Sequence, residues 1–126
     1  MGFLEKWQPQ LLSVLRFVSG LLFLEHGTAK LLHFPHVAMF DDLKLASLLG
    51  VAGIIELVGG ALVTIGLFTR YAAFLMSGEM AVAYFLFHMK QGPYPVLNGG
   101  EPAVLFCFVF LYIAAAGPGP WSVDRR

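Results

Sequence analysis

The chain has 126 residues, of which 58% are hydrophobic and 13% charged, and its formal net charge is zero. A soluble domain of this size cannot bury four long apolar stretches, so the composition indicates a multi-pass membrane protein that sits in the lipid bilayer. The chain has no basic run, which excludes nucleic acid as a partner. A single cysteine, Cys107, excludes an internal disulfide and a cysteine metal cluster within one chain.

The first apolar segment covers residues 10–32 and predicts a membrane-spanning helix that is retained, because no signal-peptide cleavage site follows it. Helical spacing puts Arg16, Gly20, Gly27 and Lys30 close together on one face. Small residues beside a cation are typical of a helix face that packs against protein. We therefore expect this face to point inward.

The second span is predicted over residues 45–68, after a loop or short interfacial helix at residues 33–44. Its one ionisable residue, Glu56, lies near the middle and shares a stripe with Gly53 and Gly60. A carboxylate at this depth costs about 3 kcal/mol on insertion scales. It is therefore expected to face the protein interior, with a partner or a bound proton.

The third span is predicted over residues 71–88, with Glu79 as a central acid on a face of small residues, and the fourth over residues 100–117. A segment rich in glycine and proline connects them and predicts a re-entrant or capping loop. The four spans predict an all-α fold, an integral membrane antiparallel four-helix bundle that forms a single domain over residues 1–126. Both termini then lie on one side of the membrane, and the positive-inside rule favours the cytoplasmic side.

The helical rise gives the depth of each polar residue and sorts these residues into two layers. The inner layer contains Arg16 and Glu79, with the Tyr112 hydroxyl nearby, and predicts a charge pair that either locks two helices together or binds a ligand. The outer layer contains Glu56 and His26, with a second histidine, His88, at a similar depth.

A histidine beside a desolvated carboxylate is suited to proton transfer. Because no cation is placed at the depth of Glu56, we expect this acid to be protonated or to take part in chemistry. No metal-binding spacing such as HExxH is present in the sequence, so no metal site is predicted. The candidate catalytic residues are Glu56 and His26, and the candidate ligand-binding residues are Arg16, Glu79, His88, Asn98, Glu101 and Tyr112.

Four blocks of the sequence resemble, in this order, the DoxX family of small four-helix bacterial membrane proteins. They are LRFVSGLLFLEHGTAKL, GIIELVGGALVTIGLFTRYAA, GEMAVAYFLFH and QGPYPVLNGGEPAVLFCFVFLYIAAAGPGPWSVD. The resemblance extends over nearly the whole chain. It implies a four-helix bundle in the bacterial cytoplasmic (inner) membrane and an association with redox work. Relatives are linked to quinone-coupled thiosulfate oxidation, to resistance against quinones and catechols, and to complexes with a superoxide dismutase and a sulfurtransferase.

Three hypotheses for the function remain open at this point. In the first, the chain is a component of a quinone-linked oxidoreductase, in which a quinone enters among the phenylalanines while Glu56 and His26 handle the protons. In the second, it is a non-catalytic membrane anchor for soluble redox enzymes, and its buried charges only hold the helices in place. The third is a small-molecule or proton carrier. Faces of small residues also make a homodimer a hypothesis for assembly.

Overall fold

The computed structural model describes residues 2–124 of the chain. Within this range every regular element is helical and there is no strand, so the predicted all-α fold is confirmed. Three helical stretches are long and apolar enough to cross a membrane, and a fourth apolar helix is shorter. The four main helices are α2 (Gln8–Leu31), α3 (Leu48–Ile65), α4 (Thr69–Ala83) and α6 (Glu101–Ala116).

Short elements connect or extend these helices. The α4 helix continues without a break through a π-helical segment and a 3₁₀ turn as far as Gln91. The short elements are α1 (Gly2–Glu5), the 3₁₀ turns Ala38–Phe40 and Met89–Gln91, the π-helix Tyr84–His88, and α5 (Pro95–Asn98). The segment at residues 33–44, expected to be a loop or interfacial helix, is thus mostly irregular and holds a single 3₁₀ turn.

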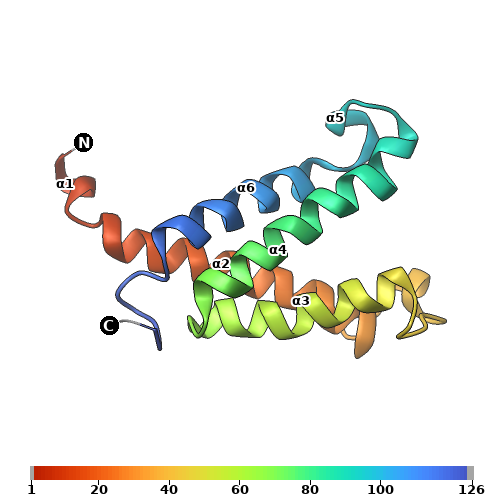
Figure 1. The fold of residues 1–126 in the computed structure, drawn as a ribbon, viewed down its shortest axis with the longest axis horizontal. Coiled ribbons are helices and arrows are strands. Elements are labelled where there is room, and N and C mark those ends of the chain that lie inside the picture. Colours follow the sequence, from red (N-terminus) through yellow and green to blue (C-terminus); the bar gives the residue numbers. More distant parts are fainter. Residues whose placement is uncertain (1, 125–126) are drawn as a thin grey trace.

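The helices form two antiparallel pairs, α2 with α3 and α4 with α6, as Figure 1 shows. The pairs meet where α3 ends and α4 begins, at the end that we call the terminal end because the chain segment after α6 lies there. At the opposite end, here called the open end, the two pairs diverge. The divergence leaves α3 and α4 in contact over only part of their lengths.

Glycines decide how closely α2 and α3 pack. A Cβ atom on Gly27 would lie 2.4 Å from the backbone nitrogen of Leu57, and one on Gly60 would lie 2.7 Å from the Cα atom of Leu24. Any larger side chain would therefore force the two backbones apart. The small-residue face of the first span does point inward, as its spacing indicates.

A tight core lies between the two pairs. Phe23 of α2 is packed edge to face on Phe110 of α6, with ring centroids 5.0 Å apart. Met76 of α4 and Val63 of α3 are completely buried beside them. Because these side chains come from all four main helices, they hold the two pairs together near the terminal end.

The segment after α6 folds back across the terminal end. The amide of Val123 donates a hydrogen bond to the carbonyl of Ile65 (3.2 Å), and the amide of Asp124 donates to that of Gly66 (2.8 Å). The Asp124 carboxylate in turn accepts hydrogen bonds from the first amides of α4, those of Phe68 (3.0 Å) and Thr69 (2.7 Å). This acid therefore caps α4 from a distant part of the chain.

Candidate functional site: an acid cluster beside an apolar groove

Glu56 is buried and paired with a lysine. Its side chain on α3 is 1% exposed, and its Oε1 atom lies 2.6 Å from Nζ of Lys30 on α2. The prediction that Glu56 lacks a counter-charge is therefore wrong. A lysine side chain is long and leans toward the start of its own helix, so its ammonium lies at a different depth from its backbone.

Glu79 adds a second carboxyl group from α4. It lies beside Glu56 and within electrostatic reach of Lys30. Its Oε1 atom is buried and has no hydrogen-bond partner among the described residues. We call Lys30, Glu56 and Glu79 the triad. Three different helices thus contribute one basic and two acidic groups to a single cluster, in which Glu56 is buried and Lys30 and Glu79 are partly buried.

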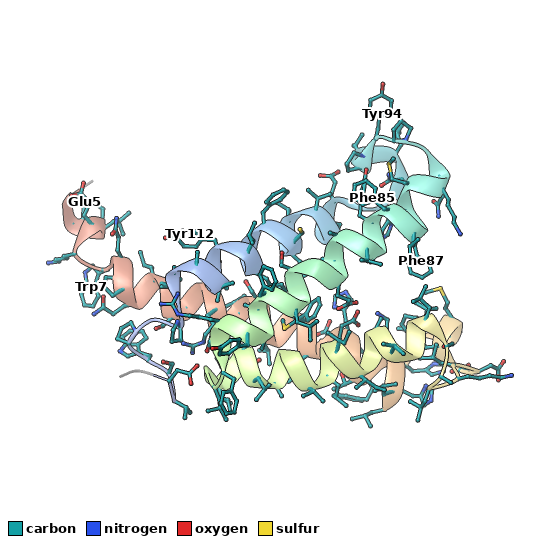
Figure 2. The ribbon with its side chains drawn as sticks, in the orientation of Figure 1. Glu5, Trp7, Phe85, Phe87, Tyr94 and Tyr112 are labelled. Carbon is teal, nitrogen blue, oxygen red and sulfur yellow. The ribbon has the colours of Figure 1, made fainter. Side chains whose placement is uncertain are left out.

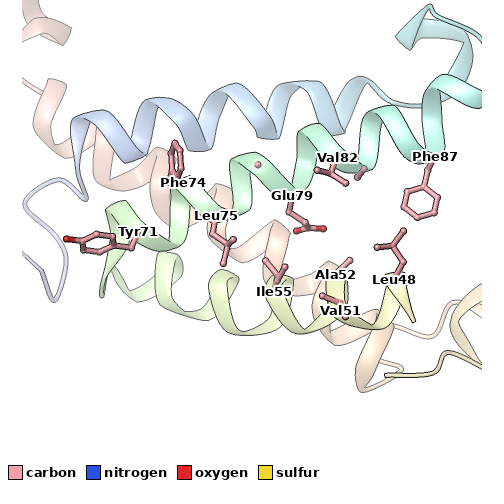
Figure 3. A pocket seen from close by; sticks show the side chains of 12 residues that line it. Leu48, Val51, Ala52, Ile55, Tyr71, Phe74, Leu75, Glu79, Val82 and Phe87 are labelled. Carbon is pink, nitrogen blue, oxygen red and sulfur yellow. The ribbon is translucent and has the colours of Figure 1, made fainter. Parts of the chain in front are cut away.

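An apolar groove of about 470 Å³ opens beside the triad, between α3 and α4. Figure 3 shows the Glu79 side chain pointing from α4 toward α3, while Phe87 and Leu48 face each other nearer the open end. Glu79 and Tyr71 are the only lining side chains that carry polar atoms. The lining residues are Leu48, Val51, Ala52, Ile55, Tyr71, Phe74, Leu75, Gly78, Glu79, Val82, Ala83 and Phe87.

Arg16 does not pair with Glu79, so the predicted pairing of these two residues is wrong. Arg16 is 3% exposed, and its guanidinium donates hydrogen bonds to backbone carbonyls at the terminal end. These acceptors are the carbonyl oxygens of Val63 (3.0 Å), Pro118, Trp121 (2.9 Å) and Thr64 (3.5 Å). Two of them belong to the segment after α6, whose return across the bundle cannot be inferred from depth along straight helices.

The structure does not bring His26 to Glu56. The Nδ1 atom of His26 lies 2.8 Å from the carbonyl oxygen of Leu22 in its own helix, and its ring packs against Phe106 of α6, with centroids 6.1 Å apart. His26 thus lies on the side of α2 that faces α6, whereas Lys30 lies on the side that faces α3.

His88 and Asn98 hold the loop between α4 and α6 in its conformation. The buried Asn98 side chain donates to the Gly92 carbonyl (2.8 Å) and the Tyr84 hydroxyl (3.2 Å), and it accepts from the Gly100 amide (2.8 Å). Nδ1 of His88 lies 3.1 Å from the Asn98 carbonyl, and its ring stacks on that of Tyr84. The polar atoms of the Asn98 side chain and Nδ1 of His88 therefore have their hydrogen-bond partners within this loop and the helix end beside it.

The remaining two candidates lie on the outside of the molecule. Glu101 is exposed in the first turn of α6. Tyr112 is 61% exposed, and Figure 2 shows it on the outer side of α6. Of the six residues predicted to bind a ligand, Glu79 is the one that lines the groove.

Two features of the site, the pairing of Lys30 with Glu56 and the groove, are not predicted from the sequence. Lys30 lies on the predicted inward face of the first span, three residues after Gly27, and this spacing directs its side chain toward the same neighbouring helix that Gly27 contacts, α3. The groove has no comparable signal, because it results from the angle between two helix pairs. Within residues 2–124, no three histidine, cysteine, aspartate or glutamate side chains lie close enough together to hold a metal ion.

Apolar helices that enclose a charged cluster define this chain as a multi-pass membrane protein. The DoxX family model matches residues 11–89, and the chain belongs to the DoxX family. An uncharacterized protein of Haemophilus influenzae is 44% identical, over 100% of this chain and 97% of its own length. An uncharacterized membrane protein of Mycobacterium tuberculosis is 26% identical, over 94% of this chain and 82% of its own length. No solved structure matches the chain significantly.

Proposed function

We propose that this protein is the quinone-binding membrane subunit of a redox system in the bacterial cytoplasmic membrane, with both termini in the cytoplasm. The observation that carries the proposal is the apolar groove with the Glu79 carboxyl group in its wall. A quinone has a flat apolar ring, which suits such walls, and ring oxygens that need a hydrogen-bonding group. The redox links that the DoxX resemblance implies support the same function.

Charge balance suggests how the triad handles protons. Two carboxylates and one ammonium would leave one uncompensated negative charge in a medium of low dielectric, which is costly. One proton on the acid pair makes the cluster neutral, with Glu56 ionised against Lys30 and Glu79 protonated. Protonated Glu79 then donates a hydrogen bond to a quinone oxygen in the groove.

The proposed reaction needs a partner protein. Reduction of a quinone to a quinol consumes two electrons and two protons. Glu79 delivers one proton to the ring oxygen that it touches and then regains a proton from water, while the other ring oxygen takes the second proton directly from water. The electrons come from a redox protein bound at the membrane surface. The proton-transfer role predicted for His26 stays a prediction, because its ring lies against Phe106.

Labelling with a photoreactive quinone tests this function in protein reconstituted in lipid nanodiscs. We expect peptides that cover residues 48–55 and 71–87 to carry the label, since both segments line the groove. Val82→Trp fills the groove and should remove the label, whereas Val18→Trp, a matched change at an exposed position of α2 that does not line the groove, should not. A label that Val82→Trp leaves unchanged would contradict the proposed site.

A further inference from the structure

We propose that the groove also binds a lipophilic organic cation, in exchange for the proton of Glu79. This inference uses the groove and the charge balance of the triad, and it requires no redox step. It therefore goes beyond the proposed function and can fail or succeed separately from it.

The charges of the triad indicate the sign of the ligand. Lys30 is already committed to Glu56, with Nζ and Oε1 2.6 Å apart. The charged groups that interact with Glu79 are Glu56 from α3 and Lys30 from α2. An ionised Glu79 therefore adds a negative charge that the one lysine does not balance. A ligand with a single positive charge supplies the missing charge.

The walls of the groove indicate the rest of the ligand. Three aromatic side chains of α4 and its extension line it, Tyr71 (83% exposed), Phe74 (66%) and Phe87 (37%). Aromatic faces attract cations, and this attraction is strongest where water is excluded. The other walls are aliphatic, so the body of the ligand must be apolar.

The same walls argue against a small hydrated ion. Metal cations such as Ca²⁺ take six or more oxygen ligands, and Mg²⁺ keeps an octahedral shell. The lining side chains offer only the Glu79 carboxyl group and the Tyr71 hydroxyl. An organic cation carries its charge within an apolar shell and needs only one carboxylate as a counter-charge, and the Glu79 carboxyl group can supply it.

Binding is an exchange in which charge is conserved. The O–H bond of the Glu79 carboxyl group breaks heterolytically, the proton passes to water, and the carboxylate pairs with the cation. No electron moves, and the net charge of the cluster with its ligand stays at zero. Binding should therefore strengthen as the pH rises, and one proton should be released per cation bound.

Tetraphenylphosphonium is a suitable probe, because tetraphenylborate has nearly the same size and shape with the opposite charge. Binding is measured to protein in nanodiscs of zwitterionic lipid, with empty nanodiscs as the blank. We expect saturable binding of the phosphonium, release of about one proton in weakly buffered solution, and no saturable binding of the borate. Glu79→Gln should weaken phosphonium binding at least about tenfold, since the paired charge is lost, whereas Glu101→Gln should leave it unchanged.

Several results would overturn the inference. The first is equal binding of the phosphonium and the borate, which is expected if the groove merely holds lipid chains. The second is phosphonium binding without proton release, and the third is unchanged phosphonium binding in Glu79→Gln. Should Glu79→Gln fail to fold, the pH dependence and proton release of the wild-type protein still decide the matter. If the wild-type protein is labelled by the quinone but does not bind the phosphonium, this inference alone is rejected. If it binds the phosphonium but is not labelled by the quinone, the proposed function alone is rejected.

Discussion

At the terminal end, the buried guanidinium of Arg16 donates to backbone carbonyls of α3 and of the segment after α6. Nearer the open end, by contrast, one buried carboxyl oxygen of Glu79 has no hydrogen-bond partner within residues 2–124. Both groups are ionisable and both lie among apolar helices. The difference is in how completely each is satisfied. A fully hydrogen-bonded charge contributes stability, while an incompletely satisfied one beside a groove is available to a ligand. Three substitutions test this comparison.

The largest effect is expected for Arg16→Met, which keeps the length of the side chain but removes its donors. The carbonyls of Thr64 and Trp121 would then lose the donor that Arg16 supplies, and those of Val63 and Pro118 would each lose one of two donors, at about 1–3 kcal/mol for a carbonyl left without a partner. We expect a loss of about 4 kcal/mol in the free energy of unfolding, measured by denaturant unfolding in mild detergent. The matched control is Arg70→Met, because Arg70 is exposed and donates to the carbonyls that end α6. Equal losses of unfolding free energy in Arg16→Met and Arg70→Met would show that Arg16 has no special role in stability.

Lys30→Met should have the next largest effect, because it leaves the buried Glu56 carboxylate without its cation. Breaking one side of a buried ion pair costs about 3 kcal/mol. Adding Glu56→Gln should restore most of this loss, since the double variant buries no unpaired charge. Lys44→Met, in the exposed segment before α3, serves as the control. A double variant no more stable than Lys30→Met would show that the pair is not coupled.

Asp124→Asn should have the smallest effect and a distinct pH dependence. Burial disfavours the Asp124 carboxylate, but hydrogen bonds from Thr69 and Phe68 and the charge of Arg16 outweigh it and hold the pKa of Asp124 below its ordinary value. A lowered pKa in the folded state contributes stability above the ordinary aspartate pKa of about 3.9, which is lost as the pH falls through the folded-state value.

We therefore expect Asp124→Asn to cost about 0.5 kcal/mol at pH 7, a typical value for a negative charge at a helix N-terminus, and less as the pH drops below the ordinary aspartate value. Thermal unfolding of wild type and variant across this pH range measures the difference. Asp42→Asn, in the exposed segment before α3, should change stability at neither end of the range. A cost that is independent of pH would mean that the Asp124 charge contributes nothing to the cap.

Much of the fold could be predicted from local pattern. The lengths of the apolar segments and the glycine spacing of the first span identify the helices and the face that packs inward, because a helix repeats every 3.6 residues whatever surrounds it. The boundaries of α3 also have local causes. The Ser47 hydroxyl accepts a hydrogen bond from the Gly50 amide at its start, and Gly66 ends it with a φ of +77°.

Partners of buried charges could not be predicted in the same way. Depth counted along straight, parallel helices put His26 with Glu56 and Arg16 with Glu79, but the helix pairs cross, lysine side chains bend along their helix, and the chain returns over the terminal end. These are non-local features that no sequence interval encodes. The sequence by itself thus determined a multi-pass helical membrane protein with a few buried charges. Only the tertiary structure decided that Arg16 is bound by backbone carbonyls, and that Lys30, Glu56 and Glu79 meet beside a groove, because those contacts depend on the angle between the two helix pairs.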